Sequence, residues 1–315
     1  MIWLILALIL LALVLLVSFL CCRVAFYSPL GAQNDDENLP DIGADAQTRE
    51  DILAHIHTLQ SLPYEPVEIT SYDGLRLKGR LIRAAREDAP LSLCFHGYRG
   101  TPYRDFSYGA GGYLGLGHHV LLVEERAHCT SEGHYITMGV KEREDCHAWA
   151  HAAAVAFPRS PIYLCGVSMG AATVLLASCM DLPAQVKGII ADAGYTSGAE
   201  IVKSVCRRRR LMPLYPFLCL GALLFGHFSL AQADVRAAVR RTTRPILLIH
   251  GEADPLVPCE MGRELAACHP DATLHTFPRA GHVLSYLLDE ERYLRLVQDF
   301  EKRCEAAAER SNPDE

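Results

Sequence analysis

The sequence carries little basic charge relative to its acidic charge. It holds 30 lysines and arginines against 37 aspartates and glutamates, a net charge of −7. General nucleic-acid binders carry an excess of basic residues, so we expect no nucleic-acid partner. The chain also has no zinc-type spacing of cysteines and histidines and no internal repeat. We therefore expect no bound metal and no repeat architecture.

A disulfide framework is not expected either. The twelve cysteines are spread along the chain, and several fall in segments predicted to be buried, among them Cys94, Cys165 and Cys179. Such cysteines act as small apolar side chains, and disulfide-free chains are typical of reducing compartments.

The first segment, from Met1 to Cys22, is apolar and uncharged. About 20 such residues can span a bilayer. A cleaved signal peptide would have a basic start and a small-residue cleavage site, and this segment has neither. We predict an uncleaved single-pass anchor over residues 1–23, and hence a cell-membrane location. Arg23, on its C-terminal side, favours a cytoplasmic position for the rest of the chain.

The rest of the chain predicts one large domain, residues 46–305, between a polar linker (24–45) and a polar tail (306–315). Its first strands form a predicted hairpin, 67–70 and 75–81, with an Asp73-Gly74 turn between them. Six more apolar strands alternate with helical patterns, at 91–96, 119–125, 161–167, 186–192, 245–250 and 272–277. This alternation indicates an α/β fold, a mostly parallel, doubly wound sheet with helices on both faces.

The most informative motif is Gly166-Val167-Ser168-Met169-Gly170. A predicted strand precedes it and a predicted helix follows it, the context of a nucleophile elbow. The two glycines leave room in a tight turn, and we expect strained backbone at Ser168. The hydroxyl would then stand above the sheet, beside a helix N-terminus that favours developing negative charge.

A serine nucleophile needs a base and an acid, and elbow-type enzymes place them later in the chain in the order acid, then histidine. Asp254 follows the strand at 245–250, and His282 follows the strand at 272–277. We predict His282 as the base and Asp254 as its acid. Asp192, at the end of the strand 186–192, is the rival carboxylate.

Two backbone N–H groups should stabilise the oxyanion of such a reaction. Met169, directly after the serine, would supply one of them. The second is predicted at Tyr98, in the loop that follows the strand at 91–96, where Gly97 lets the backbone approach the reacting carbonyl. Arg99 beside it either contacts a negative substrate group or is an ordinary exposed loop residue.

About 50 residues separate the strands at 186–192 and 245–250, more than one crossover helix needs. We predict a lid insertion at about 199–241. It contains the run Arg207–Arg210 and a long apolar stretch that could roof an apolar acyl pocket. The alternatives are contact with an anionic membrane surface, or a solvated helix end for the arginines.

From about residue 60 to 305 the chain resembles the α/β-hydrolases, and most closely the membrane-anchored bacterial serine hydrolases of the serine aminopeptidase/lysophospholipase-like group. The matching segments are Phe95–Tyr98, Gly166–Thr173, Ala191–Ser197, His250–Asp254, Ala280–His282 and, with one departure, Arg126–Gly133. In that last segment Cys129 stands where the group usually has glycine. The resemblance implies hydrolysis of an ester, thioester or amide, without fixing the substrate.

Together these features predict a serine hydrolase, carboxylesterase- or lipase-like, with peptidase activity left open. It would act on a small, lipid-like acyl compound through an acyl-enzyme intermediate, using Ser168, His282 and Asp254 and no cofactor. Two alternatives stay open at this point. One is an acyltransferase with the same triad, and the other is a non-catalytic binding protein with the same fold.

Overall fold

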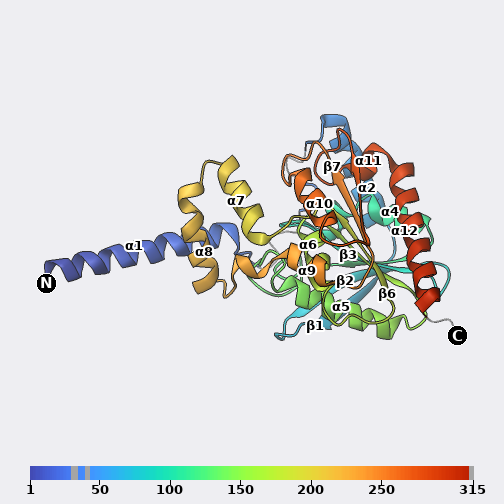
Figure 1. The fold of residues 1–315 in the computed structure, drawn as a ribbon, viewed down its shortest axis with the longest axis horizontal. Helices are drawn as coiled ribbons and strands as arrows, with labels where there is room; N and C mark the ends of the chain where they lie inside the picture. The colour runs from blue at the N-terminus through green and yellow to red at the C-terminus, as the bar shows by residue number, and fades with distance from the viewer. Residues whose placement is uncertain (30–34, 40–42, 312–315) are drawn as a thin grey trace.

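The structure, a computed structural model, describes residues 1–29, 35–39 and 43–311 (Figure 1). Parts of the predicted linker, 30–34 and 40–42, lie outside the described residues, as do 312–315 of the predicted tail. The remainder of that tail, up to Ser311, continues the last helix.

An eight-stranded sheet forms the centre of the molecule, in the order β1-β2-β4-β3-β5-β6-β7-β8. The first two strands form the predicted antiparallel hairpin, and Gly74 in its turn has a φ of 85°. β2 also pairs antiparallel with β4, and all later pairs are parallel. The strands are β1 Glu65–Thr70, β2 Arg76–Ile82, β3 Leu91–Phe95, β4 His119–Val123, β5 Ile162–Val167, β6 Val186–Asp192, β7 Ile246–Gly251 and β8 Ala272–Phe277.

Helices cover both faces of the sheet (Figure 1). The α-helices are α1 Ile2–Ala25, α2 Ala46–Gln60, α3 Pro102–Asp105, α4 Gly109–Gly115, α5 Glu142–Ala156, α6 Met169–Ala177, α7 Gly198–Arg208, α8 Tyr215–Leu224, α9 Val235–Arg241, α10 Cys259–Ala266, α11 Ser285–Leu288 and α12 Glu290–Ser311. Two short 3-10 turns, Met212–Leu214 and Leu230–Gln232, flank α8.

The sheet separates two apolar cores because successive side chains of a strand point to opposite faces. In β4, Leu121 and Val123 belong to the core with α5, α6 and α9, whereas Val120 and Leu122 belong to the core with α2, α4 and α12. Trp149 of α5 is the largest of the fully buried side chains. A sheet buried on both faces fixes the register of its strands, and so the place where each strand ends.

The apolar N-terminal segment is one helix, α1, which projects from the body (Figure 1). It is the one described helix whose length and composition would allow it to cross a bilayer. The predicted lid region holds α7, α8 and α9. The first two lie toward α1, with α8 packed against it, whereas α9 packs against α6 and α10 beside the sheet.

Candidate active site

Ser168 lies in a strained turn between β5 and α6, as the motif predicts. Its φ is 55° and its ψ is −114°, a backbone conformation that residues other than glycine rarely adopt. Both flanking glycines are required by close approach. A Cβ on Gly166 would collide with the Gly170 carbonyl, and one on Gly170 with the Phe95 carbonyl. The turn is held in place because the Ser168 N–H donates to the Asp192 carbonyl at 2.8 Å.

Asp254 and His282 meet at the carboxyl ends of β7 and β8. The His282 Nδ1 lies 2.6 Å from Asp254 Oδ2, and Asp254 Oδ1 accepts the N–H groups of Leu256 and Val257 at 2.7 and 2.9 Å. Burial would raise the pKa of Asp254, but these hydrogen bonds and the nearby imidazole hold it below its usual value. An ionised carboxylate only accepts, so Nδ1 carries the hydrogen and Nε2 is left to receive a proton.

The rival carboxylate, Asp192, is buried at the end of β6. Its Oδ1 has no hydrogen-bond partner among the described residues. Burial raises its pKa to about 7, and the charge of Asp254 adds to the shift. In the structure, His282 Nδ1 is hydrogen-bonded to Asp254 and not to Asp192. Asp192 instead accepts the Ser168 N–H through its backbone carbonyl.

The loop after β3 passes directly over the serine. A Cβ on Gly97 would lie 3.2 Å from the Ser168 Cβ, so the backbone at this point approaches the nucleophile closely. The Gly97 N–H donates to Asp105 Oδ2 at 2.7 Å. Neither the Tyr98 nor the Met169 N–H donates to another group in the described part of the chain. Whether these two N–H groups bind an oxyanion stays a prediction of the sequence.

Two buried histidines hold this loop from below. His96 Nδ1 donates to the Gly97 carbonyl at 2.9 Å, and its Nε2 accepts the Glu125 N–H at 3.1 Å. His128 Nε2 accepts the Arg99 N–H at 3.0 Å. Burial lowers the pKa of both imidazoles, so both stay neutral and keep these acceptor nitrogens. Sequence reasoning did not find His128 as a support for the loop.

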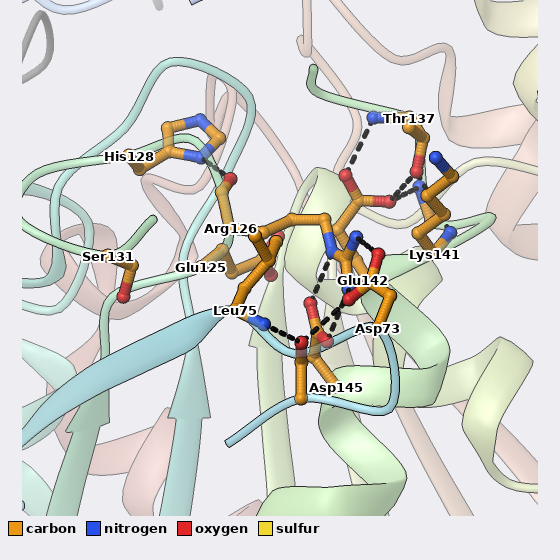
Figure 2. Close-up of polar contacts among 12 residues, drawn as sticks. Asp73, Leu75, Glu125, Arg126, His128, Ser131, Thr137, Lys141, Glu142 and Asp145 are labelled. Carbon is orange, nitrogen blue, oxygen red and sulfur yellow. Dashed lines mark hydrogen bonds and ion pairs between the residues drawn. The ribbon is translucent and has the colours of Figure 1, made fainter. Parts of the chain in front are cut away.

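An ion cluster around the buried Arg126 and Asp145 anchors the loop after β4, which carries His128 (Figure 2). Arg126 donates to both oxygens of Asp145, at 2.5 and 2.6 Å, and to both oxygens of Asp73. Burial disfavours the guanidinium charge, but these hydrogen bonds outweigh it and raise the pKa of Arg126. The Arg126 carbonyl accepts from His128 Nδ1 at 2.8 Å, which links the cluster to the loop after β3.

Farther along the same loop, Glu142 accepts the Thr137 N–H at 2.6 Å (Figure 2) and the Gly139 N–H at 2.9 Å.

Cys129, in the loop after β4, has a φ of 48°, in the region that favours glycine. This conformation gives a physical reason for glycine at the matching position of the group that the sequence resembles. The loop adopts it here with a cysteine.

Ser168, Met169, His282 and Tyr98 all line one cavity of about 970 Å³. Most of its wall is apolar, and three helices supply part of that wall. α7 contributes Ile201, Val202 and Val205, α8 contributes Leu218, and α1 contributes Val17, Leu20, Cys21 and Val24. The part played by α1 was missed from the sequence, because a segment of 20 apolar residues satisfies the pattern of a membrane anchor by itself.

Arg99 is an exposed loop residue, the second of its two predicted roles, and it also has a partner in α1. Its guanidinium donates to the Val24 carbonyl at 2.7 Å, near the C-terminal end of α1. The last carbonyls of a helix lack partners within the helix, and basic side chains satisfy them. Arg208 and Arg209, from the basic run at the end of α7, line the cavity.

Sequence comparisons give short or distant relatives. No protein-family model matches the chain. The uncharacterized protein YqkD of Bacillus subtilis (strain 168) is 26% identical over 196 residues, which cover 60% of this chain and 63% of YqkD. A pimeloyl-[acyl-carrier protein] methyl ester esterase of Methylococcus capsulatus is 37% identical over 79 residues, 25% of this chain and 31% of that protein. The chain thus matches less than two thirds of the length of either relative.

Structural comparisons cover more of the chain. An esterase of Pyrococcus furiosus is 25% identical with a TM-score of 0.60, and the match covers 78% of this chain and 93% of the esterase. The α/β hydrolase GrgF of a Penicillium species is 21% identical with a TM-score of 0.61, covering 78% of this chain and all of GrgF. These likenesses confirm the predicted α/β-hydrolase fold.

Proposed function

We propose that this chain, which has the α/β-hydrolase fold, is a membrane-anchored serine hydrolase that cleaves carboxylic esters. One observation carries the proposal. His282, whose Nδ1 lies 2.6 Å from the buried carboxylate of Asp254, lines the same cavity as a serine held at a φ of 55°. The esterase names of relatives in sequence and in structure support ester bonds over amides.

The proposed reaction uses only groups of this chain. Ser168 Oγ attacks the ester carbonyl carbon while His282 Nε2 takes the hydroxyl proton, and Asp254 stabilises the imidazolium that results. The Tyr98 and Met169 N–H groups bind the oxyanion. His282 then protonates the departing alcohol. Water, deprotonated by His282, attacks the acyl-enzyme, and the acid product leaves with Ser168 restored.

The proposal also covers location. The length and composition of α1 support a single-pass anchor, and the mostly apolar wall of the cavity supports a lipid-like acyl substrate. Arg23 favours the cytoplasmic side. Protease protection of sealed vesicles made from producing cells tests the side.

The central experiment measures hydrolysis of p-nitrophenyl esters, from acetate to palmitate, by the full chain in phospholipid nanodiscs. Ser168→Ala should lower kcat by about 10⁶, because neither the acid nor the base can act without the nucleophile. Ser61→Ala, at the exposed end of α2, is the matched control and should keep wild-type activity. A fluorophosphonate probe should label the wild type and Ser61→Ala but not Ser168→Ala.

Activity of Ser168→Ala within about tenfold of the wild type would exclude the mechanism. Product analysis with added alcohol separates hydrolysis from acyl transfer. Release of the free acid at the same rate with and without the alcohol supports hydrolysis, whereas formation of a new ester at the expense of acid would show an acyltransferase.

A further inference from the structure

The C-terminal half of α1 presents one apolar face to the cavity of Ser168. Val17, Leu20, Cys21 and Val24 all line this cavity. Their spacing of three and four residues places them on one side of a helix. Seven residues of helix span about 10 Å, so the face extends well beyond the reacting groups.

α8 holds α1 in this position from the side. A Cβ on Gly221 of α8 would collide with the Ser18 carbonyl and lie 3.0 Å from the Cys22 Cβ, so the two helices approach closely at this glycine. Ser18 and Cys22 are buried there. The ring of Phe19 packs edge-to-face on Phe225, with 5.3 Å between centroids.

The end of α1 is also fixed to the oxyanion loop. The Tyr98 hydroxyl donates to the Ala25 carbonyl at 2.6 Å, and the Arg99 guanidinium donates to the Val24 carbonyl at 2.7 Å. The loop that would supply an oxyanion donor is therefore hydrogen-bonded to the C-terminal end of α1, where the two meet in the wall of the cavity. A flexible tether would need neither the close packing on α8 nor these hydrogen bonds.

We propose that this helix, besides anchoring the chain, forms the acyl-binding wall of the active site. The substrate is then an amphiphile with a medium to long acyl chain, which lies along Val17, Leu20 and Val24 and is covered by α7 and α8. This inference rests on the proposed esterase function and adds the class of its substrate. Leu20 and Val24 remain 52% and 74% exposed at the cavity, and an acyl chain would cover this apolar surface.

The test changes the wall and measures chain-length preference. Leu20→Trp places a larger side chain in the cavity, whereas Leu16→Trp makes the same change one turn earlier, on a residue that is also 52% exposed but does not line the cavity. Each buried methylene should raise kcat/KM about fourfold. Loss of the room for about two methylenes should therefore lower the ratio of laurate to butyrate hydrolysis about 15-fold in Leu20→Trp.

The full chain in nanodiscs is used throughout, and thermal unfolding checks that each variant folds. A lower laurate-to-butyrate ratio in Leu20→Trp alone supports the acyl wall. Equal ratios in the wild type and Leu20→Trp overturn it, as does an equal fall in both variants. If the wild type hydrolyses butyrate and Leu20→Trp leaves the laurate-to-butyrate ratio unchanged, this inference alone is refuted. If the wild type is inactive on every ester and unlabelled by fluorophosphonate, the proposed function is refuted as well.

Discussion

The reacting edge of the sheet and the helical wall above it are built in different ways. At the edge, hydrogen bonds hold Asp254 and the loop after β3. Asp254 accepts three, and both ring nitrogens of His96 are occupied. In the wall, α1 packs on α8 mainly through apolar side chains, and its polar contacts with the loop after β3 lie at its last turn.

Backbone strain is most frequent at the edge. Among the residues with positive φ that are not glycine, Arg99, Cys129, Ser168, Ala193 and Arg279 lie in the loops after the parallel strands, whereas Arg210 and His227 follow α7 and α8. α1 has none. Strained backbone persists where the surrounding structure fixes it, and it is concentrated at functional sites. The two proposals therefore predict separate effects: changes at the edge should alter the rate for every ester alike, and changes in the wall should alter chain-length preference.

The sharpest test of the edge is Asp254→Asn. An amide in place of the carboxylate would no longer stabilise the imidazolium and would favour the wrong tautomer of His282. We expect kcat to fall about 10⁴-fold, by the same factor for butyrate and laurate. Steady-state kinetics of the full chain measures this, with the exposed Asp88→Asn as control. A change in chain-length preference would break the division between edge and wall.

Gly97→Ala tests the oxyanion loop with a single methyl group. The new Cβ would lie 3.2 Å from the Ser168 Cβ and 3.1 Å from Asp105 Oδ2, so the loop must shift. Loss of an oxyanion donor costs about 10²–10³ in kcat, and a displaced donor should cost about tenfold, again for all chain lengths. Gly115→Ala, where the methyl group meets nothing within 4 Å, should leave kcat unchanged. Equal kinetics for the two variants would remove Tyr98 from the site.

The edge was largely predictable from sequence, and the wall was not. Short apolar strands that precede Ser168, Asp254 and His282 can be recognised from local sequence alone. A parallel sheet then brings the carboxyl ends of these strands together. The wall depends on how α1 packs against α8, and these two helices are separated by about 200 residues of chain. Nothing in the composition of α1 distinguishes a face toward lipid from a face toward substrate, since both require apolar side chains.

Gly221→Ala tests the wall without touching the cavity lining. Its methyl group would push α8 away from the Ser18 carbonyl and so move α1. We expect the laurate-to-butyrate ratio to change by severalfold, about the effect of one methylene, while butyrate kinetics change less. Gly111→Ala in α4 adds the same methyl group where nothing lies within 4 Å, and it should leave the ratio unchanged. An equal fall in the hydrolysis of both esters in Gly221→Ala would mean that moving α1 also disturbs the edge, and would contradict the division between edge and wall.

The smallest expected effect concerns the buried carboxyl behind the edge. Burial raises the pKa of Asp192 from 3.8 to about 7, so the folded state favours its protonated form. Its contribution to stability is complete below about pH 4 and is lost as the pH rises through 7, by at most about 4 kcal/mol. Asp192→Asn stays neutral, so its Tm relative to the wild type should rise by about 5 °C between pH 5 and pH 8. The exposed Asp299→Asn should show no such change. A Tm difference for Asp192→Asn that is independent of pH would mean that the carboxyl is ionised throughout, and that the edge tolerates a second buried charge beside Asp254.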